Sequence, residues 1–188
     1  GEFYNFKQYK SKLEKKGYKF RSNSDTEVLI YLYQEYGIEK TLDKINGMFA
    51  FAIWDKTIDK VFVCRDRLGI KPLFNSNNDK QFIFASELKA ILASNKVTKQ
   101  VDKQAIYDYF SLKTIPAPAT GFVGIKKLLP GHYIRVSKKG IQIKEYWDLE
   151  IDKFHKDSKE NTISHIDEMF NLSVKRRMIS DVPIGAFL

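Results

Sequence analysis

The chain has 188 residues, 43% hydrophobic and 14% aromatic, which is enough apolar material for one domain or one domain and a part. No stretch approaches the roughly 20 consecutive apolar residues of a membrane helix, and no signal peptide is expected, so the cytosol is the expected compartment. Cys64 is the only cysteine, which excludes a disulfide framework and a multi-cysteine zinc site within the chain.

The formal net charge of +9 has two interpretations. Basic residues are dense between Lys7 and Arg21 and again at 175–177, as on a nucleic-acid-binding surface. The other interpretation is a solvated lysine-rich surface, with the last cluster favourably placed at a helix C-terminus. No RNA-binding aromatic motif, finger spacing or long basic run accompanies the charge. We therefore do not expect a nucleic acid as partner.

The first elements along the chain are helices. Residues 5–16 form a polar helical pattern that Gly17 ends. The segment 24–27 (Ser-Asp-Thr-Glu) predicts a capping box, in which Ser24 caps the next helix and Glu27 reaches back to the cap nitrogen. Apolar residues then recur at helical spacing until Gly37, which we expect to end that helix.

Strand patterns follow. Residues 48–55 are apolar on both faces, as in a strand covered on each side, and residues 61–64 predict a second such strand. Residues 72–74 and 82–85 predict another pair around a loop at 75–79, which is rich in turn-forming residues.

Helices are predicted at 87–93 and at 103–110, the second capped by Asp102. The two prolines in 116–119 predict a stiff, extended crossing segment. Residues 132–136 and 141–146 predict a hairpin around 138–140.

The last part of the chain has a different character. Residues 152–158 predict a linker, and residues 162–178 a helix that has Ile166, Met169, Phe170 and Ser173 on one face. Residues 182–188 have the pattern of a buried strand. The inventory fits two packed sheets with helices outside, followed by the start of an α/β domain.

Seven motifs, in this order and at compatible spacing, resemble those of glutamine-hydrolysing asparagine synthetases, and the similarity runs over essentially the whole chain. They are 1–5 (GEFYN), 24–27 (SDTE), 46–52 (NGMFAFA), 65–73 (RDRLGIKPL), 85–90 (ASELKA), 129–132 (LPGH) and 180–185 (SDVPIG).

The resemblance implies an α+β fold. Residues 1–151 would be a partial four-layer αββα sandwich of the N-terminal-nucleophile hydrolase type, a glutaminase domain lacking its N-terminal part. Residues 152–188 would be the linker, helix and first strand of an α/β ATP-pyrophosphatase domain that acts as the synthetase.

The implied parent activity makes asparagine from aspartate, ATP with Mg²⁺, and glutamine, with ammonia passing inside the protein between two sites. Glutamine, aspartate and ATP are thus the implied partners, and a homodimer is left open. An amidotransferase acting on another carboxylate, as in envelope-polysaccharide assembly, is an alternative, since the residues that select aspartate lie beyond Leu188. A non-catalytic, basic nucleic-acid-binding module is the alternative of another class.

The family's nucleophile is a cysteine at the mature N-terminus, upstream of Gly1. We therefore expect no catalytic nucleophile in this chain, and the chain alone to be inactive and to bind no cofactor. Cys64 does not replace the nucleophile, because that chemistry uses the free α-amine of the nucleophile's own residue as base. Its apolar strand predicts a buried, inert thiol.

Four residues match binding positions of the family. Gly1 and Glu2 resemble the end of an Asn-Gly-Glu signature in which the asparagine side chain and the glycine amide stabilise the oxyanion, so Gly1 is a partial oxyanion hole. Glu2 and Asp25 resemble residues that hold the α-amino end of glutamine. Leu188 would contact ATP. The plain alternatives are a cloning remnant at Gly1, a helix-start acid at Asp25 and a core leucine at Leu188.

Two further features receive structural interpretations. Arg65 and Asp66, between a buried strand and a turn, are predicted to fix loop geometry rather than to do chemistry. His132, His155 and His165 show no metal-ligand spacing, and we interpret them as surface or hairpin residues.

Overall fold

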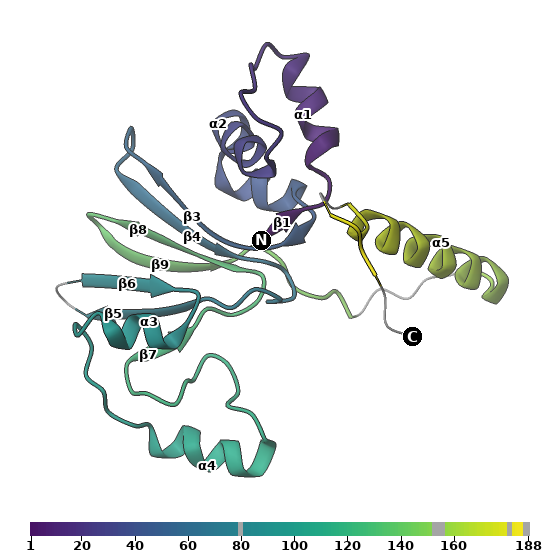
Figure 1. The fold of residues 1–188 in the computed structure, drawn as a ribbon. Coiled ribbons are helices and arrows are strands. Elements are labelled where there is room, and N and C mark those ends of the chain that lie inside the picture. The colour runs from purple at the N-terminus through teal and green to yellow at the C-terminus, as the bar shows by residue number, and fades with distance from the viewer. Residues whose placement is uncertain (79–80, 152–156, 180–181, 186–188) are drawn as a thin grey trace. The chain divides into compact units, whose positions relative to one another are not determined.

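A computed structural model describes residues 1–78, 81–151, 157–179 and 182–185 (Figure 1). The chain divides into two compact units. One contains Gly1–Glu2 and Gly47–Asp148, and the other contains Phe3–Asn46 and Leu149–Leu188. The short strands β1 (Glu2–Phe3) and β2 (Gly47–Met48) lie where the chain passes from one unit to the other.

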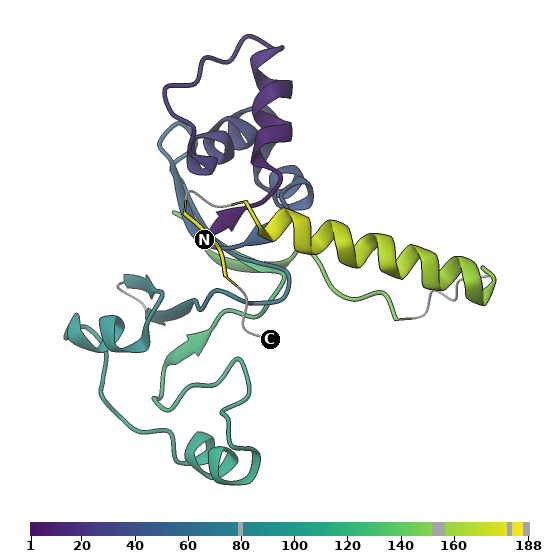
Figure 2. The ribbon, with the colours of Figure 1, turned by 45° about the vertical axis from the view of Figure 1, so that its right-hand side comes forward.

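The second unit is helical, with α1 (Phe6–Glu14), α2 (Asp25–Lys44) and α5 (Lys159–Arg177). Helices α1 and α2 pack side by side (Figure 1 and Figure 2). The helix predicted up to Gly37 is confirmed, since this residue has non-helical torsion angles. The helical segment between Gly37 and Lys44 was not predicted. It buries Ile38, Thr41 and Leu42, and this packing favours a second helical run after the break.

The predicted capping box is half right. The side chain of Ser24 accepts a hydrogen bond from the Thr26 amide at 3.2 Å, so Ser24 is the cap. Glu27 does not reach back to it. Its carboxylate accepts from the amides of Arg21 and Ser22, each at 2.8 Å, while the Ser24 amide is bound by the Ser22 hydroxyl at 3.2 Å. The loop before the helix competes successfully for the carboxylate, because it offers two adjacent amides.

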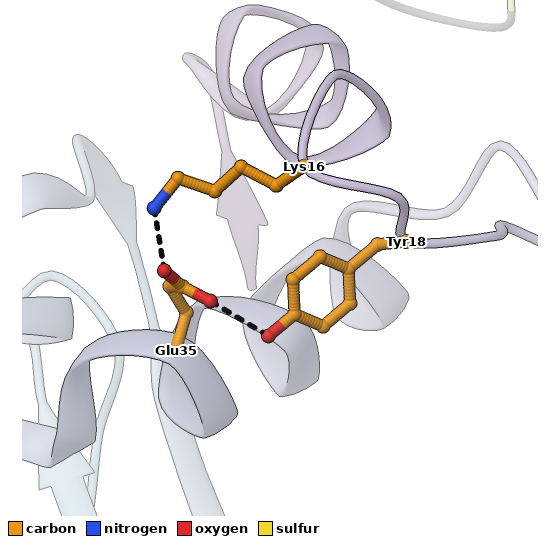
Figure 3. A network of polar contacts seen from close by, with 3 residues as sticks. All are labelled: Lys16, Tyr18 and Glu35. Atoms are coloured by element: carbon orange, nitrogen blue, oxygen red, sulfur yellow. Dashed lines mark hydrogen bonds and ion pairs between the residues drawn. The ribbon is translucent and has the colours of Figure 1, made fainter.

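The loop between α1 and α2 is tied to α2 through Glu35. One carboxylate oxygen lies 2.5 Å from the Lys16 ammonium, and the other accepts a hydrogen bond from the Tyr18 hydroxyl at 2.8 Å (Figure 3). Apolar side chains complete the attachment, with Leu13 of α1 and Leu32 of α2 both buried. The helical unit thus combines a small apolar core with a polar clamp at its loop.

The first unit contains a four-stranded antiparallel sheet in the order β3-β4-β8-β9. Its strands are β3 (Ala50–Asp55), β4 (Lys60–Arg65), β8 (His132–Ser137) and β9 (Gly140–Glu145). The hairpin of β8 and β9 was predicted. The pairing of β4 with β8, in which Cys64 lies opposite Tyr133, joins segments that are far apart in the sequence.

A three-stranded antiparallel sheet, ordered β6-β5-β7, is the second layer of this unit. It contains β5 (Phe74–Asn78), β6 (Gln81–Ala85) and β7 (Ile125–Lys127). The loop predicted at 75–79 is wrong for residues 75–78, which belong to β5. Because β5 is the central strand, its backbone bonds to two neighbours outweigh the turn preference of asparagine and serine.

A common core joins the two sheets. Val63 of β4, Ile134 of β8, Leu73 and Leu128 are buried together, and Phe82 of β6 packs against them. Helix α3 (Leu88–Ala93), predicted from the sequence, contacts β5 and β6. The described part of the chain is therefore α+β, with antiparallel sheets and helices, as predicted.

Three local predictions have different outcomes. Helix α4 (Lys103–Leu112) begins as predicted, with the Asp102 carboxylate accepting from the Ala105 amide at 3.1 Å. Strand β3 is not covered on both faces, since Trp54 is 62% exposed. This strand lies at the edge of its sheet. The segment 116–119 is a turn rather than an extended crossing, closed by a hydrogen bond from the Ala119 amide to the Pro116 carbonyl at 3.0 Å.

Helix α5 is capped by Ser158, whose hydroxyl accepts from the Asn161 amide at 3.2 Å. On the face predicted from the sequence, Ile166, Met169 and Phe170 are exposed, Phe170 by 67%. The buried strand predicted at 182–188 is wrong for residues 182–185, which are exposed and form no strand, and the other residues of that prediction lie outside the described parts. Among the described helices, α5 included, none has the length and apolar character to span a membrane.

Candidate functional site

Gly1 lies against the backbone at the end of β2. A methyl group at this position would lie 2.6 Å from the carbonyl oxygen of Met48 and 2.9 Å from the Cα atom of Phe49. Real Cβ atoms do not approach backbone atoms so closely. The contact between Gly1 and the Met48–Phe49 peptide therefore requires glycine in this arrangement.

The backbone of Met48 and Phe49, which lies beside Gly1, is held by Asp66, the residue directly after β4. The Phe49 amide donates to Asp66 Oδ2 at 3.2 Å, and the Asp66 amide donates to the Phe49 carbonyl at 2.9 Å. The motif that contains Phe49 and the motif that contains Asp66 are thus bound to each other in both directions.

Asp66 is also the centre of its own loop. Its Oδ1 accepts from the amides of Leu68 at 3.2 Å and Ile70 at 2.9 Å, and Oδ2 accepts from Lys71 at 2.9 Å. The side chain is 1% exposed and carries a carboxylate with four amide donors. Such charge-assisted bonds stabilise a buried carboxylate that would otherwise be costly.

Arg65 fixes the other side of the loop. Its guanidinium donates to the carbonyls of Lys71 and Gly69, each at 2.8 Å, and to the carbonyl of Leu128. Burial lowers the pKa of Arg65, and the neighbouring Asp66 carboxylate opposes this shift. All these bonds go to backbone atoms, as expected if Arg65 and Asp66 determine loop geometry.

The motif at 129–132 joins the same cluster. The Gly131 amide donates to the Asp66 carbonyl at 3.0 Å, and Gly131 has a φ of +65° and lies too close to the Trp147 carbonyl for any side chain. The hydroxyl of Tyr146 donates to the Arg65 carbonyl at 2.7 Å, and burial raises the pKa of Tyr146. Three of the motifs read from the sequence therefore meet around Asp66.

Asp25 lies in the helical unit, in the first turn of α2. Its Oδ2 accepts a hydrogen bond from the amide of Phe3 at 2.9 Å, and the residue lies near Phe6, Tyr9 and Val28. Phe3 directly follows Glu2, whose side chain is exposed. Sequence patterns do not reveal the Phe3 bond, because a backbone amide carries no residue-specific signal.

The other candidate residues have simpler surroundings. Leu188 lies outside the described residues. Cys64 is fully buried, as predicted, and burial raises the pKa of its thiol well above the usual value. His132 contacts the Pro130 carbonyl through Nδ1 at 2.7 Å. Within the described ranges no group of three or more His, Cys, Asp or Glu side chains is placed to hold a metal ion.

Known proteins with similar sequences and folds include amidotransferases. Asparagine synthetase [glutamine-hydrolyzing] 3 of Bacillus subtilis is 41% identical over 189 residues, covering 100% of this chain and 30% of the relative. Asparagine synthetase [glutamine-hydrolyzing] 1 of the same organism is 36% identical, with 100% and 29% covered. Amidase chry2 of Gibberella zeae is 33% identical, with 100% and 28% covered. The chain thus spans about 30% of the length of the first of these relatives.

A solved structure supports the fold. Glutamine phosphoribosylpyrophosphate amidotransferase from B. subtilis, complexed with ADP and GMP, has a TM-score of 0.54 at 22% identity. The match covers 78% of this chain and 28% of that one. The fold is therefore of the N-terminal-nucleophile type found in glutamine amidotransferases. The family model for the glutamine amidotransferase domain matches residues 1–147. The chain belongs to the glutamine amidotransferase domain family.

Proposed function

We propose that this chain is the glutamine-handling part of a glutamine-hydrolysing asparagine synthetase, which releases ammonia from glutamine and uses it, with ATP, to convert aspartate into asparagine. One observation carries the proposal. Similarity to the B. subtilis synthetases extends over 100% of this chain, at 36–41% identity. Residues 1–151 act as the glutaminase domain, and residues 152–188 begin the synthetase domain, in agreement with a family match that ends at residue 147.

Gly1 supplies one donor of the oxyanion hole in this proposal. Its backbone amide stabilises the negative charge that develops on the side-chain carbonyl oxygen of glutamine during attack. One such donor typically contributes about 3–4 kcal/mol to the transition state. The close approach of Gly1 to Met48 and Phe49 supports the assignment, because it restricts where the amide can lie.

Glu2 and Asp25 bind the α-ammonium group of glutamine. An ammonium group that leaves water needs carboxylates in place of its lost hydration, since an unpaired buried charge is costly. Asp25 is half-buried and its carboxylate is held by the Phe3 amide, which orients it before any ligand arrives. This pre-orientation supports a binding role.

ATP with Mg²⁺ and aspartate are proposed as substrates of the longer protein, and the cytoplasm as its compartment. ATP with Mg²⁺ supplies the activation of the aspartate carboxylate. Leu188, the residue assigned near the nucleotide, lies outside the described residues. Within the described parts of the chain, the proposed binding residues Gly1, Glu2 and Asp25 all serve glutamine.

The test uses the full-length protein that contains this chain. Purified enzyme with aspartate, ATP and Mg²⁺ is supplied with glutamine or with ammonium salt, and asparagine, glutamate and AMP are measured. Asparagine from both nitrogen sources, with glutamate formed only from glutamine, is the expected result. Absence of glutaminase activity rejects the glutamine role of this chain.

A second candidate function is amide transfer to a different carboxylate. The 33% identity to Amidase chry2 favours it. That relative is similar over 100% of this chain, as the synthetases are, but it is named as an amidase and not as an asparagine synthetase. Glutamine hydrolysis without asparagine formation, combined with amide transfer to another acid, would support this alternative.

A further inference from the structure

We propose that Asp66 is a positioning residue for the glutaminase reaction, because it fixes the Phe49 peptide against which the oxyanion-hole residue Gly1 lies. The inference rests on the proposed function, which assigns Gly1 to the oxyanion hole. Asp66 does not bind glutamine in this proposal. It holds Phe49, and Phe49 in turn determines the position of the Gly1 amide.

The first step is the double attachment of Phe49. Asp66 binds the Phe49 amide through its carboxylate at 3.2 Å and the Phe49 carbonyl through its own amide at 2.9 Å. The Phe49 N–H belongs to the Met48–Phe49 peptide and the Phe49 C=O to the Phe49–Ala50 peptide, so Asp66 binds the peptides on both sides of Phe49. The Met48–Phe49 peptide cannot rotate without breaking its bond to the Asp66 carboxylate. The Met48–Phe49 peptide is therefore held by Asp66, the residue directly after β4.

The second step is the contact with Gly1. The position of a Gly1 Cβ lies 2.6 Å from the Met48 oxygen and 2.9 Å from the Phe49 Cα. The space between Gly1 and the Met48–Phe49 peptide is too small even for a methyl group, so a shift of this peptide changes the surface against which Gly1 packs. A displacement of about 1 Å at a reacting group can reduce a rate by about 10²-fold.

The third step is the need for a carboxylate at position 66. Its two oxygens accept four amide hydrogens, from Phe49 and Lys71 at Oδ2 and from Leu68 and Ile70 at Oδ1. Asparagine has one acceptor oxygen and one NH2 group. In either orientation of the amide, two of the four N–H groups would face another donor. Asp66→Asn therefore loosens either the Met48–Phe49 peptide or the loop after β4 that contains residue 66.

Tyr146→Phe provides a matched control within the same cluster. The Tyr146 hydroxyl donates to the Arg65 carbonyl at 2.7 Å, and no described contact joins this hydroxyl to Phe49. Removing it weakens the cluster but leaves both bonds between Asp66 and Phe49. A purely structural cluster would respond to both substitutions in the same way, whereas a positioning role separates them.

The experiment measures glutamine-dependent and ammonia-dependent asparagine synthesis in the full-length wild-type enzyme, Asp66→Asn and Tyr146→Phe. For Asp66→Asn we expect the kcat with glutamine to fall about 10- to 10²-fold. The KM for glutamine should change little, since Glu2 and Asp25 are intact, and the ammonia-dependent rate should be retained. For Tyr146→Phe we expect a lower melting temperature and an unchanged ratio of the two rates.

A wild-type kcat with glutamine in folded Asp66→Asn would overturn the inference, as would equal losses of the two activities in that variant. If Asp66→Asn does not fold, Gly1→Ala decides, because its methyl group displaces Gly1 from Phe49 directly. A selective loss of glutamine-dependent kcat in Gly1→Ala supports the contact, and full kcat overturns it. Wild-type enzyme without glutaminase activity rejects the proposed function itself, which is a distinct result.

Discussion

The ammonium group of Lys16 lies 2.5 Å from the carboxylate of Glu35, and the hydroxyl of Tyr18 donates to the other oxygen of that carboxylate at 2.8 Å (Figure 3). The hydrogen bond from Lys16 lowers the pKa of Glu35, with a smaller effect from Tyr18. The same bonds raise the pKa of Lys16 and of Tyr18. The contacts therefore favour an ionised Glu35 together with a protonated Lys16 and a protonated Tyr18, and in this state the three side chains hold the loop between α1 and α2.

A pH-dependent stability follows from these shifts. Because the pKa of Glu35 is lowered, its contribution is present above the unfolded pKa near 4.5 and is lost as the pH falls through the folded value. The raised pKa of Tyr18 gives a contribution that is present below 10.0 and is lost as the pH rises through the folded value. Glu35→Gln should therefore lower the melting temperature most near neutral pH.

Thermal melts of the wild type and Glu35→Gln, from acid to alkaline pH, check this prediction. The difference in melting temperature should shrink at both ends of the range. Glu14→Gln in α1 is the control, because Glu14 is exposed and its side chain takes part in no hydrogen bond or ion pair within the described structure. A difference that stays constant with pH would show that Glu35 acts by packing and not by charge.

Removing the cap of α4 should destabilise the chain. The Asp102 carboxylate accepts from the Ala105 amide at 3.1 Å, and Asp102→Ala leaves that amide without its partner. The free energy of unfolding in urea should fall by about 0.5–2 kcal/mol, the usual range for such a cap. Asp108→Ala removes a half-buried carboxylate that accepts a hydrogen bond from the Gln104 side chain within the same helix, and it should have a smaller effect. Equal effects would contradict a capping role.

The thiol of Cys64 should be inert in the folded chain. It is fully buried between β3 and β8, and burial raises its pKa, so little thiolate is available to react. In the 188-residue chain, a thiol reagent should give no colour under native conditions and full reaction in denaturant. Rapid native labelling would contradict the buried position and would reopen the question of a reactive Cys64.

Local signals in the sequence predicted the helix starts. Ser24 and Asp102 cap their helices through amides two or three residues away, so neighbouring residues determine the result. Glu27 failed as a reciprocal cap because loop residues 21–22 compete for it. The strand at 75–78 was missed because its neighbours in the sheet, and not its own side chains, decide its conformation. Exposure of Trp54 likewise depends on the order of strands.

The candidate site was only partly predictable. Motifs predict Gly1, Glu2 and Asp25 as binding residues and Asp66 as a loop residue. The sequence did not show that Asp66 binds Phe49, because this contact depends on the path of the chain between β2 and the loop after β4. The bond between Asp25 and the Phe3 amide was missed for the same reason. Backbone partners are chosen by the fold and leave no pattern in the residue types.

The assignment of Asp25 to the α-ammonium of glutamine predicts a selective effect of Asp25→Asn in the full-length enzyme. Asparagine retains an oxygen for the Phe3 amide, now bound at 2.9 Å, but removes the negative charge. Loss of a desolvated charge pair costs about 2–5 kcal/mol, much of it from the ammonium left unpaired. Glutamine-dependent synthesis should fall by orders of magnitude, mainly through a higher KM for glutamine, and ammonia-dependent synthesis should stay near the wild-type rate.

Asp25→Ala separates the binding role from a purely structural one. Alanine loses both the charge and the hydrogen bond to Phe3, whereas asparagine loses only the charge. If Asp25 serves only to hold Phe3 and the start of α2, Asp25→Asn should behave like the wild type and Asp25→Ala should lower stability and both activities. If it binds glutamine, both variants should lose glutamine-dependent synthesis, and Asp25→Asn should keep its stability and its ammonia-dependent rate. Steady-state kinetics with the two nitrogen sources, together with thermal melts of both variants, distinguish these outcomes, because only the binding role affects Asp25→Asn selectively.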